Sequence, residues 1–105
     1  MRYTIVMADN ITVPESFQPF LWSVDVKKID INAQKRYIIH QLLHYGDIDA
    51  FHWLEDTYSL STLQDVFVHH PEKMYTEKSF AFVQKFLLHL NGEKIEKERY
   101  VSVVS

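Results

Sequence analysis

The sequence predicts a mainly α-helical protein, a small four-helix bundle preceded by an extended N-terminal arm. Its 105 residues suit a single domain. Between residues 30 and 92, apolar side chains recur at helical spacing in four successive segments, and a Ser, Thr or Asp that can cap a helix lies near the start of each. We therefore divide the chain into an arm at 1–29, a helical core at 30–92 and a C-terminal extension at 93–105.

The arm is expected to run extended towards the first helix. Apolar residues occupy every even position from 20 to 26, and alternate residues of an extended chain lie on one side. We expect Phe20 and Trp22 to anchor the arm on the helices. If Trp22 is buried, its replacement by Ala should cost about 3 to 5 kcal/mol.

Asp30 is expected to cap the first helix, which would begin at Ile31 and stop at Gly46 in a left-handed conformation. The buried stripe of this helix is predicted to be Ile31, Ile38, Ile39, Leu42, Leu43 and Tyr45. His40 and His44 project away from the stripe and should face solvent.

Asp47 is expected to cap the second helix directly after Gly46. Its inner face is predicted to be Phe51, Leu54 and Tyr58. Its outer face is polar and mostly acidic, and consists of Asp49, His52, Glu55 and Asp56.

Ser61 and Gln64 have the spacing of a capping box for the third helix, which Pro71 would end. The inner side of that helix is predicted to be Leu63, Val66, Phe67 and His70.

The fourth helix would follow a connector at 71–75 and begin at a Thr76 cap. Its apolar arc is the widest of the four, so we expect it to be the central, most buried helix, closed by Asn91 and Gly92. The predicted apolar set is Phe80, Phe82, Val83, Phe86, Leu87 and Leu90. Two β-prone segments, 3–7 and 100–104, are hypothesised to pair in a short ladder, within one chain or between two.

Composition and charge exclude several classes of function. The chain has no cysteine, which excludes a disulfide framework and thiolate chemistry. No apolar run reaches membrane-spanning length, and we expect a cytoplasmic protein. The net charge of -3 is spread along the chain rather than clustered, so nucleic acid is not an expected partner. Two glycines cannot supply a glycine-rich phosphate loop, and we expect neither an enzyme nor a bound metal or cofactor.

His40 and His44 are the strongest candidates for a metal site, because two histidines one helical turn apart can both bind zinc. A catalytic zinc also needs a third protein ligand and usually a nearby base, but Gln41 stands where the common His-Glu-x-x-His pattern has Glu. We therefore rank a metal-dependent hydrolase third among three candidate functions.

The second-ranked function is a DNA-binding regulator that uses a helix-turn-helix-like pair at 61–91. The connector of this pair is longer than the usual three or four residues, and Glu77 stands near the end that would read bases.

Four short motifs resemble a family of small uncharacterised bacterial and archaeal proteins. Its members share an aromatic-Trp-x-x-Asp motif, a Lys-aliphatic-Asp helix start, a Gly-Asp break and a Trp-Leu helix that ends in Tyr-Gly. The matching residues are Phe20, Trp22 and Asp25; Lys28, Ile29 and Asp30; Gly46 and Asp47; and Trp53, Leu54 and Tyr58. The resemblance covers about residues 17–91. It departs at Ser59, where the family usually has Gly, and at the connector, which is shorter and more basic in the family.

The resemblance implies an antitoxin-like protein, since such proteins are often small companions of nucleotidyltransferase-type toxins. Our leading interpretation is a non-enzymatic protein-binding module with a partner of that kind, and self-association is left open. The residues selected for partner binding are Trp22 on the arm and three acidic residues of the second helix, Asp49, Glu55 and Asp56, which would suit a basic surface.

Overall fold

The computed structural model describes residues 12–90 and 94–102, and in these residues the chain is mainly helical, as predicted. The four α-helices of this part are α1 (Lys35–Tyr45), α2 (Ile48–Tyr58), α3 (Leu60–His69) and α4 (Glu77–Phe82). A π-helical segment, η3 (Val83–Leu87), follows α4 directly. Two short 3-10 helices, η2 (Glu15–Phe20) and η4 (Lys97–Arg99), lie before α1 and after η3.

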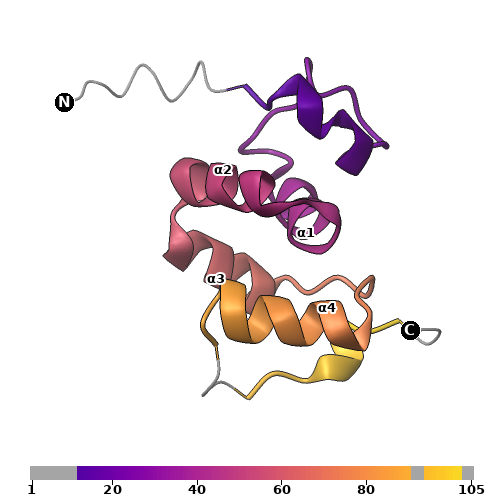
Figure 1. The fold of residues 1–105 in the computed structure, drawn as a ribbon, viewed down its shortest axis with the longest axis vertical. Coiled ribbons are helices and arrows are strands. Elements are labelled where there is room, and N and C mark those ends of the chain that lie inside the picture. The colour runs from indigo at the N-terminus through magenta and orange to yellow at the C-terminus, as the bar shows by residue number, and fades with distance from the viewer. Residues whose placement is uncertain (1–11, 91–93, 103–105) are drawn as a thin grey trace.

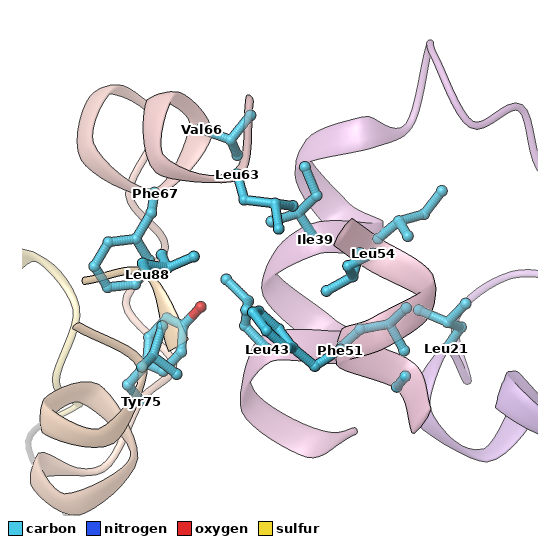
Figure 2. Close-up of a cluster of buried hydrophobic side chains, with 14 of the residues drawn as sticks. Leu21, Ile39, Leu43, Phe51, Leu54, Leu63, Val66, Phe67, Tyr75 and Leu88 are labelled. Carbon is cyan, nitrogen blue, oxygen red and sulfur yellow. The ribbon is translucent and has the colours of Figure 1, made fainter. Parts of the chain in front are cut away.

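The helices are stacked in tiers along the longest dimension of the molecule, which measures 40 × 28 × 22 Å (Figure 1). η2 and the turns after it lie at one end, α1 and α2 lie in the middle, and α3 and α4 lie at the other end with the C-terminal segment. Figure 2 shows Leu63 of α3 directed towards Ile39 of α1, with Leu21 on the far side of α1 and α2. The hydrophobic core therefore runs through all the tiers.

α1 is the most buried helix, with six of its eleven residues in the core. Four residues of the predicted apolar stripe are buried as expected, namely Ile38, Ile39, Leu42 and Leu43. The prediction that Asp30 caps this helix is wrong, because the N-cap of α1 is Gln34, which makes no side-chain cap. The Asp30 carboxylate instead caps the preceding turn and accepts hydrogen bonds from the backbone N–H groups of Asn32 (2.8 Å) and Ala33 (3.0 Å). A turn at 31–34 follows this cap, so α1 begins four residues later than predicted.

Gly46 ends α1 for a different reason from the one predicted. Its φ of -76° and ψ of 169° are extended, so the prediction of a left-handed stop is wrong. A Cβ at this position would lie 2.5 Å from the carbonyl oxygen of Leu42 and 2.7 Å from the Cβ of Ala50. Glycine is therefore required because α1 and α2 approach too closely here for a side chain.

The start and the inner face of α2 agree with the prediction. Asp47 is the N-cap, and its carboxylate accepts a hydrogen bond from the Ala50 N–H at 2.9 Å. Phe51 and Leu54 are buried. Tyr58 is half-buried and donates a hydrogen bond from its hydroxyl to the carbonyl of Ile31 at 2.7 Å, which ties α2 to the turn before α1.

α3 is capped by Ser59, so the predicted capping box of Ser61 and Gln64 is wrong. The Ser59 hydroxyl accepts a hydrogen bond from the Thr62 N–H at 3.4 Å, and the Ser59 backbone has a φ of 74° and a ψ of 154°. Gln64 instead donates to the carbonyl of Leu88 at 2.7 Å. The inner side of α3 is Leu63, Val66 and Phe67 as predicted, but His70 is exposed.

The segment 71–75, predicted to be a connector, carries Tyr75 into the centre of the core, where it is 0% exposed. Tyr75 and Val101 form an isolated parallel β-bridge. The Tyr75 N–H donates to the carbonyl of Tyr100 at 2.8 Å, and the Tyr75 carbonyl accepts from the Ser102 N–H at 2.9 Å. The C-terminal segment is therefore fixed to the chain just before α4.

Tyr100 belongs to the predicted C-terminal β-prone segment, and its ring is buried and stacks on Phe67 with the centroids 4.6 Å apart. The other half of the predicted ladder, 3–7, lies outside the described residues. Asn91 and Gly92, the residues predicted to close the fourth helix, also lie outside them.

α4 begins as predicted, because Thr76 and Ser79 form a reciprocal capping box with hydrogen bonds of 3.0 Å in both directions. It is a short helix on the edge of the core, however, with Phe80 as its one buried residue. The prediction that the fourth helix is the central one is therefore wrong.

The π-helical segment changes which residues after α4 face the core. The Leu88 N–H donates to the carbonyl of Val83 at 2.9 Å, one residue further back than in an α-helix. With one extra residue in the turn, Leu88 is buried whereas Leu87 is half-buried. Phe82 and Phe86, predicted to be in the apolar arc, remain on the surface.

The N-terminal segment packs on α1 and α2, but it is not extended between residues 20 and 26. η2 is followed by turns that the Gln18 side chain holds. The Gln18 amide nitrogen donates to the carbonyls of Leu21 (3.0 Å) and Val24 (2.7 Å), and its amide oxygen accepts from the Val26 N–H (3.2 Å). These hydrogen bonds fold the segment into turns. The apolar residues at the even positions 20–26 therefore do not all lie on one side, although the sequence predicts that they do.

The anchors of the segment differ accordingly. Phe17, Leu21 and Val26 are buried, and Phe20 is half-buried against the core. Only Phe17 and Phe20 of these lie within η2, three residues apart and so on the same side of the 3-10 helix. Leu21 and Val26 are brought to the core by the turns after it. Trp22 is 58% exposed, and its prediction as an anchor is wrong.

Candidate functional site

Five large apolar side chains are exposed on the described part of the chain. They are Trp22 (58%), Tyr45 (43%), Ile48 (60%), Phe82 (53%) and Phe86 (67%). They come from the turns after η2, the end of α1, the start of α2 and the segment formed by α4 and η3. We call this set the apolar strip.

Contacts make the apolar strip continuous at its two ends. The rings of Trp22 and Tyr45 pack edge to face with their centroids 4.7 Å apart, and the Tyr45 ring contacts His44 at 4.3 Å. At the other end, Phe82 and Phe86 pack with their centroids 5.7 Å apart. Residues distant in the sequence are therefore gathered on neighbouring parts of the surface.

A pocket of about 200 Å³ joins the two ends, because His44, Ile48 and Phe82 all line it. Its remaining walls are mostly apolar and include Leu42, Leu43, Phe51, Val83 and Leu87. Ligand sites usually measure roughly 300 to 1,000 Å³, so this pocket has the size for one apolar side chain rather than a cofactor.

Gly46 and a hydrogen bond between α1 and α4 shape the mouth of this pocket. Gly46 lines it without a side chain, and His44 Nδ1 lies 2.9 Å from the Ser79 hydroxyl. Burial lowers the pKa of His44, which favours the neutral imidazole. His44 therefore adds no charge to the pocket, and Asp47 is the charged residue that lines it.

Charged side chains border the apolar strip with opposite signs at its two sides. Asp47 and Asp49 flank Ile48 at the start of α2, and all three are exposed. Lys78 lies four residues before Phe82, on the same side of α4, and Lys85 adjoins Phe86. No ion pair of the described residues involves these four charged groups.

The partner-binding residues predicted from the sequence are all exposed, but the structure does not gather them in one place. Trp22 lies at one end of the apolar strip, and Asp49 adjoins Ile48 within it. Glu55 and Asp56 lie about 10 Å further along α2, given a rise of about 1.5 Å per residue.

Four residues of the apolar strip were not predicted as surface residues that bind a partner. Tyr45, Phe82 and Phe86 follow the helical periodicity and were placed in the core, and Ile48 was assigned to neither face. The sequence does carry one signal for Ile48, since it directly follows the Asp47 cap and stands between two acids.

His40 is buried, so the prediction that it faces solvent is wrong. It is 1% exposed and joins α1 to two later parts of the chain. Its Nδ1 lies 2.7 Å from the Tyr75 hydroxyl and its Nε2 lies 2.7 Å from the His70 carbonyl. A neutral ring satisfies both contacts when Nε2–H donates to the carbonyl and Nδ1 accepts from the hydroxyl.

Both ring nitrogens of His40 are engaged in these hydrogen bonds, so neither is free to bind a metal. Burial lowers the pKa of His40 to about 4, an effect that the hydrogen bond to His70 opposes and the nearby charge of Arg36 reinforces. His40 is therefore a structural residue. The described residues contain no group of three or more side chains that could hold a metal ion.

The helix-turn-helix interpretation meets a geometric difficulty in α3 and α4. α4 has only six residues before it continues as the π-helical η3, and the surface of the two presents Phe82 and Phe86. In a helix-turn-helix the second helix reads base edges from its N-terminal residues, and the first turn of α4 contains Glu77.

Comparison with known proteins gives one match. Residues 17–67 are similar to a family of unknown function, DUF6922. The matched segment runs from η2 into α3 and includes Trp22, Tyr45 and Ile48 of the apolar strip. Neither the curated proteins nor the solved structures contain a match to this chain. No helix of the described residues has the length and apolar character to cross a membrane.

Proposed function

We propose that this chain is a non-enzymatic protein-binding module that docks a partner protein on the apolar strip. One observation carries the proposal: among the described residues, the exposed ring pairs Trp22–Tyr45 and Phe82–Phe86 are linked by an apolar pocket that Ile48 and Phe82 line. Large contiguous apolar patches on a soluble domain commonly mark interaction sites.

The composition of the apolar strip supports the same function. Trp, Tyr and Phe are enriched in the centres of protein interfaces, because each buries a large area while fixing few torsions. The pocket between Ile48 and Phe82 would receive one apolar side chain of the partner, as an anchor residue does in tight interfaces. The borders of opposite charge would set the orientation of the partner.

The partner we propose is a nucleotidyltransferase-type toxin, for which this chain would serve as an antitoxin-like companion. The support for this identity is the resemblance of the sequence motifs, and the matched family itself has no assigned function. In this role the module would mask or position the partner without doing chemistry on it.

The proposal is tested by affinity capture from the native cells at moderate salt, with bound proteins identified and bound nucleic acid quantified. Tagged wild-type chain should retain one stoichiometric protein, and Phe86→Ser should lose it because the strip loses its most exposed ring. Lys73→Ser, an exposed change outside the apolar strip, should retain the partner and serves as the control. Equal capture by wild type and Phe86→Ser would overturn the proposal.

The same experiment separates this function from the alternative, a DNA-binding regulator that uses the pair at 61–91. Recovery of DNA in place of a protein, with retention that falls steeply as salt is raised, would favour the regulator.

A further inference from the structure

We infer that a second copy of this chain also binds the apolar strip, about a twofold axis that passes near the pocket. In this dimer the Ile48 side of one copy meets the Phe82 and Phe86 side of the other, and the reverse contact forms on the opposite side of the axis. The inference goes beyond the proposed function, because it requires no other protein.

The first support is the distribution of charge along the sequence. Residues 37–72 contain six acidic residues and no Lys or Arg. Residues 73–105 contain six basic residues against four acidic ones. The chain thus has an acidic middle, which runs from within α1 through α2 and α3, and a basic final third, which begins before α4.

The second support is that this asymmetry reaches the edges of the apolar strip. Asp47 and Asp49 border it at Ile48, whereas Lys78 and Lys85 border it at Phe82 and Phe86. Within the part of the chain that the structure describes, none of the four charges is used in an ion pair. The Asp47 carboxylate caps α2, so Asp49, Lys78 and Lys85 are the charges that a complementary surface would use.

A twofold axis makes the strip complementary to itself. In an interface between identical copies related by such an axis, each contact occurs twice, with the roles of the two copies exchanged. A surface with acids on one side of the axis and bases on the other then places acid against base at both edges. If each side of the strip met the same side of the other copy, acids would face acids and bases would face bases, which is unfavourable.

The size of the strip suits a reversible dimer. If a large apolar side chain offers roughly 150 to 250 Å² when fully exposed, the five exposed fractions amount to about 500 Å² per copy. A standard stable interface buries about 800 Å² per partner, so the strip and its charged borders approach that size. We expect a reversible dimer, which would compete with any partner that uses the same strip.

The test is sedimentation velocity and light scattering of the purified full chain from about 1 to 500 µM. The mass should rise from monomer to dimer and no further. Lys85→Glu and Asp49→Lys should each weaken the dimer at least tenfold, because each creates a like-charge contact at both edges. The double variant should return to within about threefold of wild type. Phe86→Ser should weaken the dimer at least tenfold, and Lys73→Glu, the same charge change outside the strip, should leave it unchanged.

Three results would overturn the inference: a monomer at every concentration, a larger or open-ended assembly, or a double variant no better than the single ones. These results are distinguishable from failure of the proposed function. A chain that stays monomeric but loses a captured partner on Phe86→Ser retains the proposed function without the dimer. A dimer that behaves as expected, in a chain that captures no partner, retains the dimer alone.

Discussion

Ser59 is the residue at which one substitution should make the protein more stable. Its φ of 74° and ψ of 154° lie in a region of backbone conformation that is almost exclusive to glycine. A residue with a Cβ is held there at an energetic cost, because α2 and α3 fix the chain on both sides. Ser59→Gly removes the Cβ and should therefore relieve strain at the start of α3.

The expected gain in stability is the backbone strain that Ser59→Gly relieves, less the two costs of introducing glycine and losing the cap. Holding a non-glycine residue in such a conformation costs about 1 to 3 kcal/mol. Glycine loses about 0.5 to 1 kcal/mol through its greater freedom in the unfolded chain. The cap that Ser59 provides is long at 3.4 Å, and its replacement by glycine costs only about 0.3 kcal/mol. Ser59→Gly should therefore stabilise the fold by about 1 kcal/mol.

Ser59→Ala is the matched comparison, because it keeps the strained Cβ and removes the cap. It should destabilise the fold by about 1 kcal/mol, which separates the two variants by about 2 kcal/mol. Ser61→Gly is the control within the first turn of α3, where glycine gives no relief and should cost about 0.5 kcal/mol.

The assay is urea unfolding followed by tryptophan fluorescence, below about 1 µM so that self-association does not contribute. With a slope of about 1 to 3 kcal/mol per molar urea, the midpoint should rise by about 0.5 M for Ser59→Gly and fall by a similar amount for Ser59→Ala. If Ser59→Gly is no more stable than Ser59→Ala, the backbone at this position is not strained and the reasoning fails.

Three further changes test other parts of the fold. Gly46→Ala should lower the unfolding free energy by about 2 kcal/mol in a thermal melt, because its Cβ would collide with α1 and with Ala50; a loss below about 0.5 kcal/mol would contradict this close approach. Because burial lowers the pKa of His40 to about 4 from an ordinary value of 6.5, the unfolded chain binds the proton more readily, and stability should fall by up to about 3 kcal/mol as the pH drops from 6.5 to 4. His40→Leu should be less stable at pH 7, and its urea midpoint should change less with pH than that of the wild type. If the urea midpoint of the variant changes with pH as much as before, groups other than His40 cause the pH dependence. Leu21→Ala should cost about 3 kcal/mol in urea unfolding whereas Trp22→Ala should cost less than about 1 kcal/mol, and equal losses would contradict the placement of these side chains.

Features that depend on a few neighbouring residues could be predicted from the sequence. Asp47 and Thr76 cap their helices as expected, because a cap needs only a side-chain oxygen and the N–H groups two or three residues on. Four of the six predicted stripe residues of α1, and Phe51 and Leu54 of α2, also follow from periodicity, since both helices are regular over three turns.

Features that depend on contacts between distant residues could not be predicted in this way. His40 lies on a polar position of the α1 pattern, and it is buried only because Tyr75 and His70, more than 29 residues later, satisfy its two nitrogens. The predicted geometry of the arm failed for a related reason. The Gln18 side chain forms hydrogen bonds to the backbone of residues 21–26 and holds this segment in turns. The pattern of apolar residues in the sequence does not indicate these hydrogen bonds.

The apolar strip shows how a misplaced residue can carry functional information. Periodicity assigned Tyr45, Phe82 and Phe86 to the core, but all three are exposed: Phe82 lies on the outer side of α4, and Phe86 lies in the π-helical segment that turns Leu88 inward. π-helical turns disturb regular hydrogen bonding and are often found at functional sites. A chain that needed only a stable core could place polar residues at these positions without loss of packing. Their apolar character is what the proposed docking of a partner or a second copy would explain, and the capture and charge-swap experiments distinguish the two.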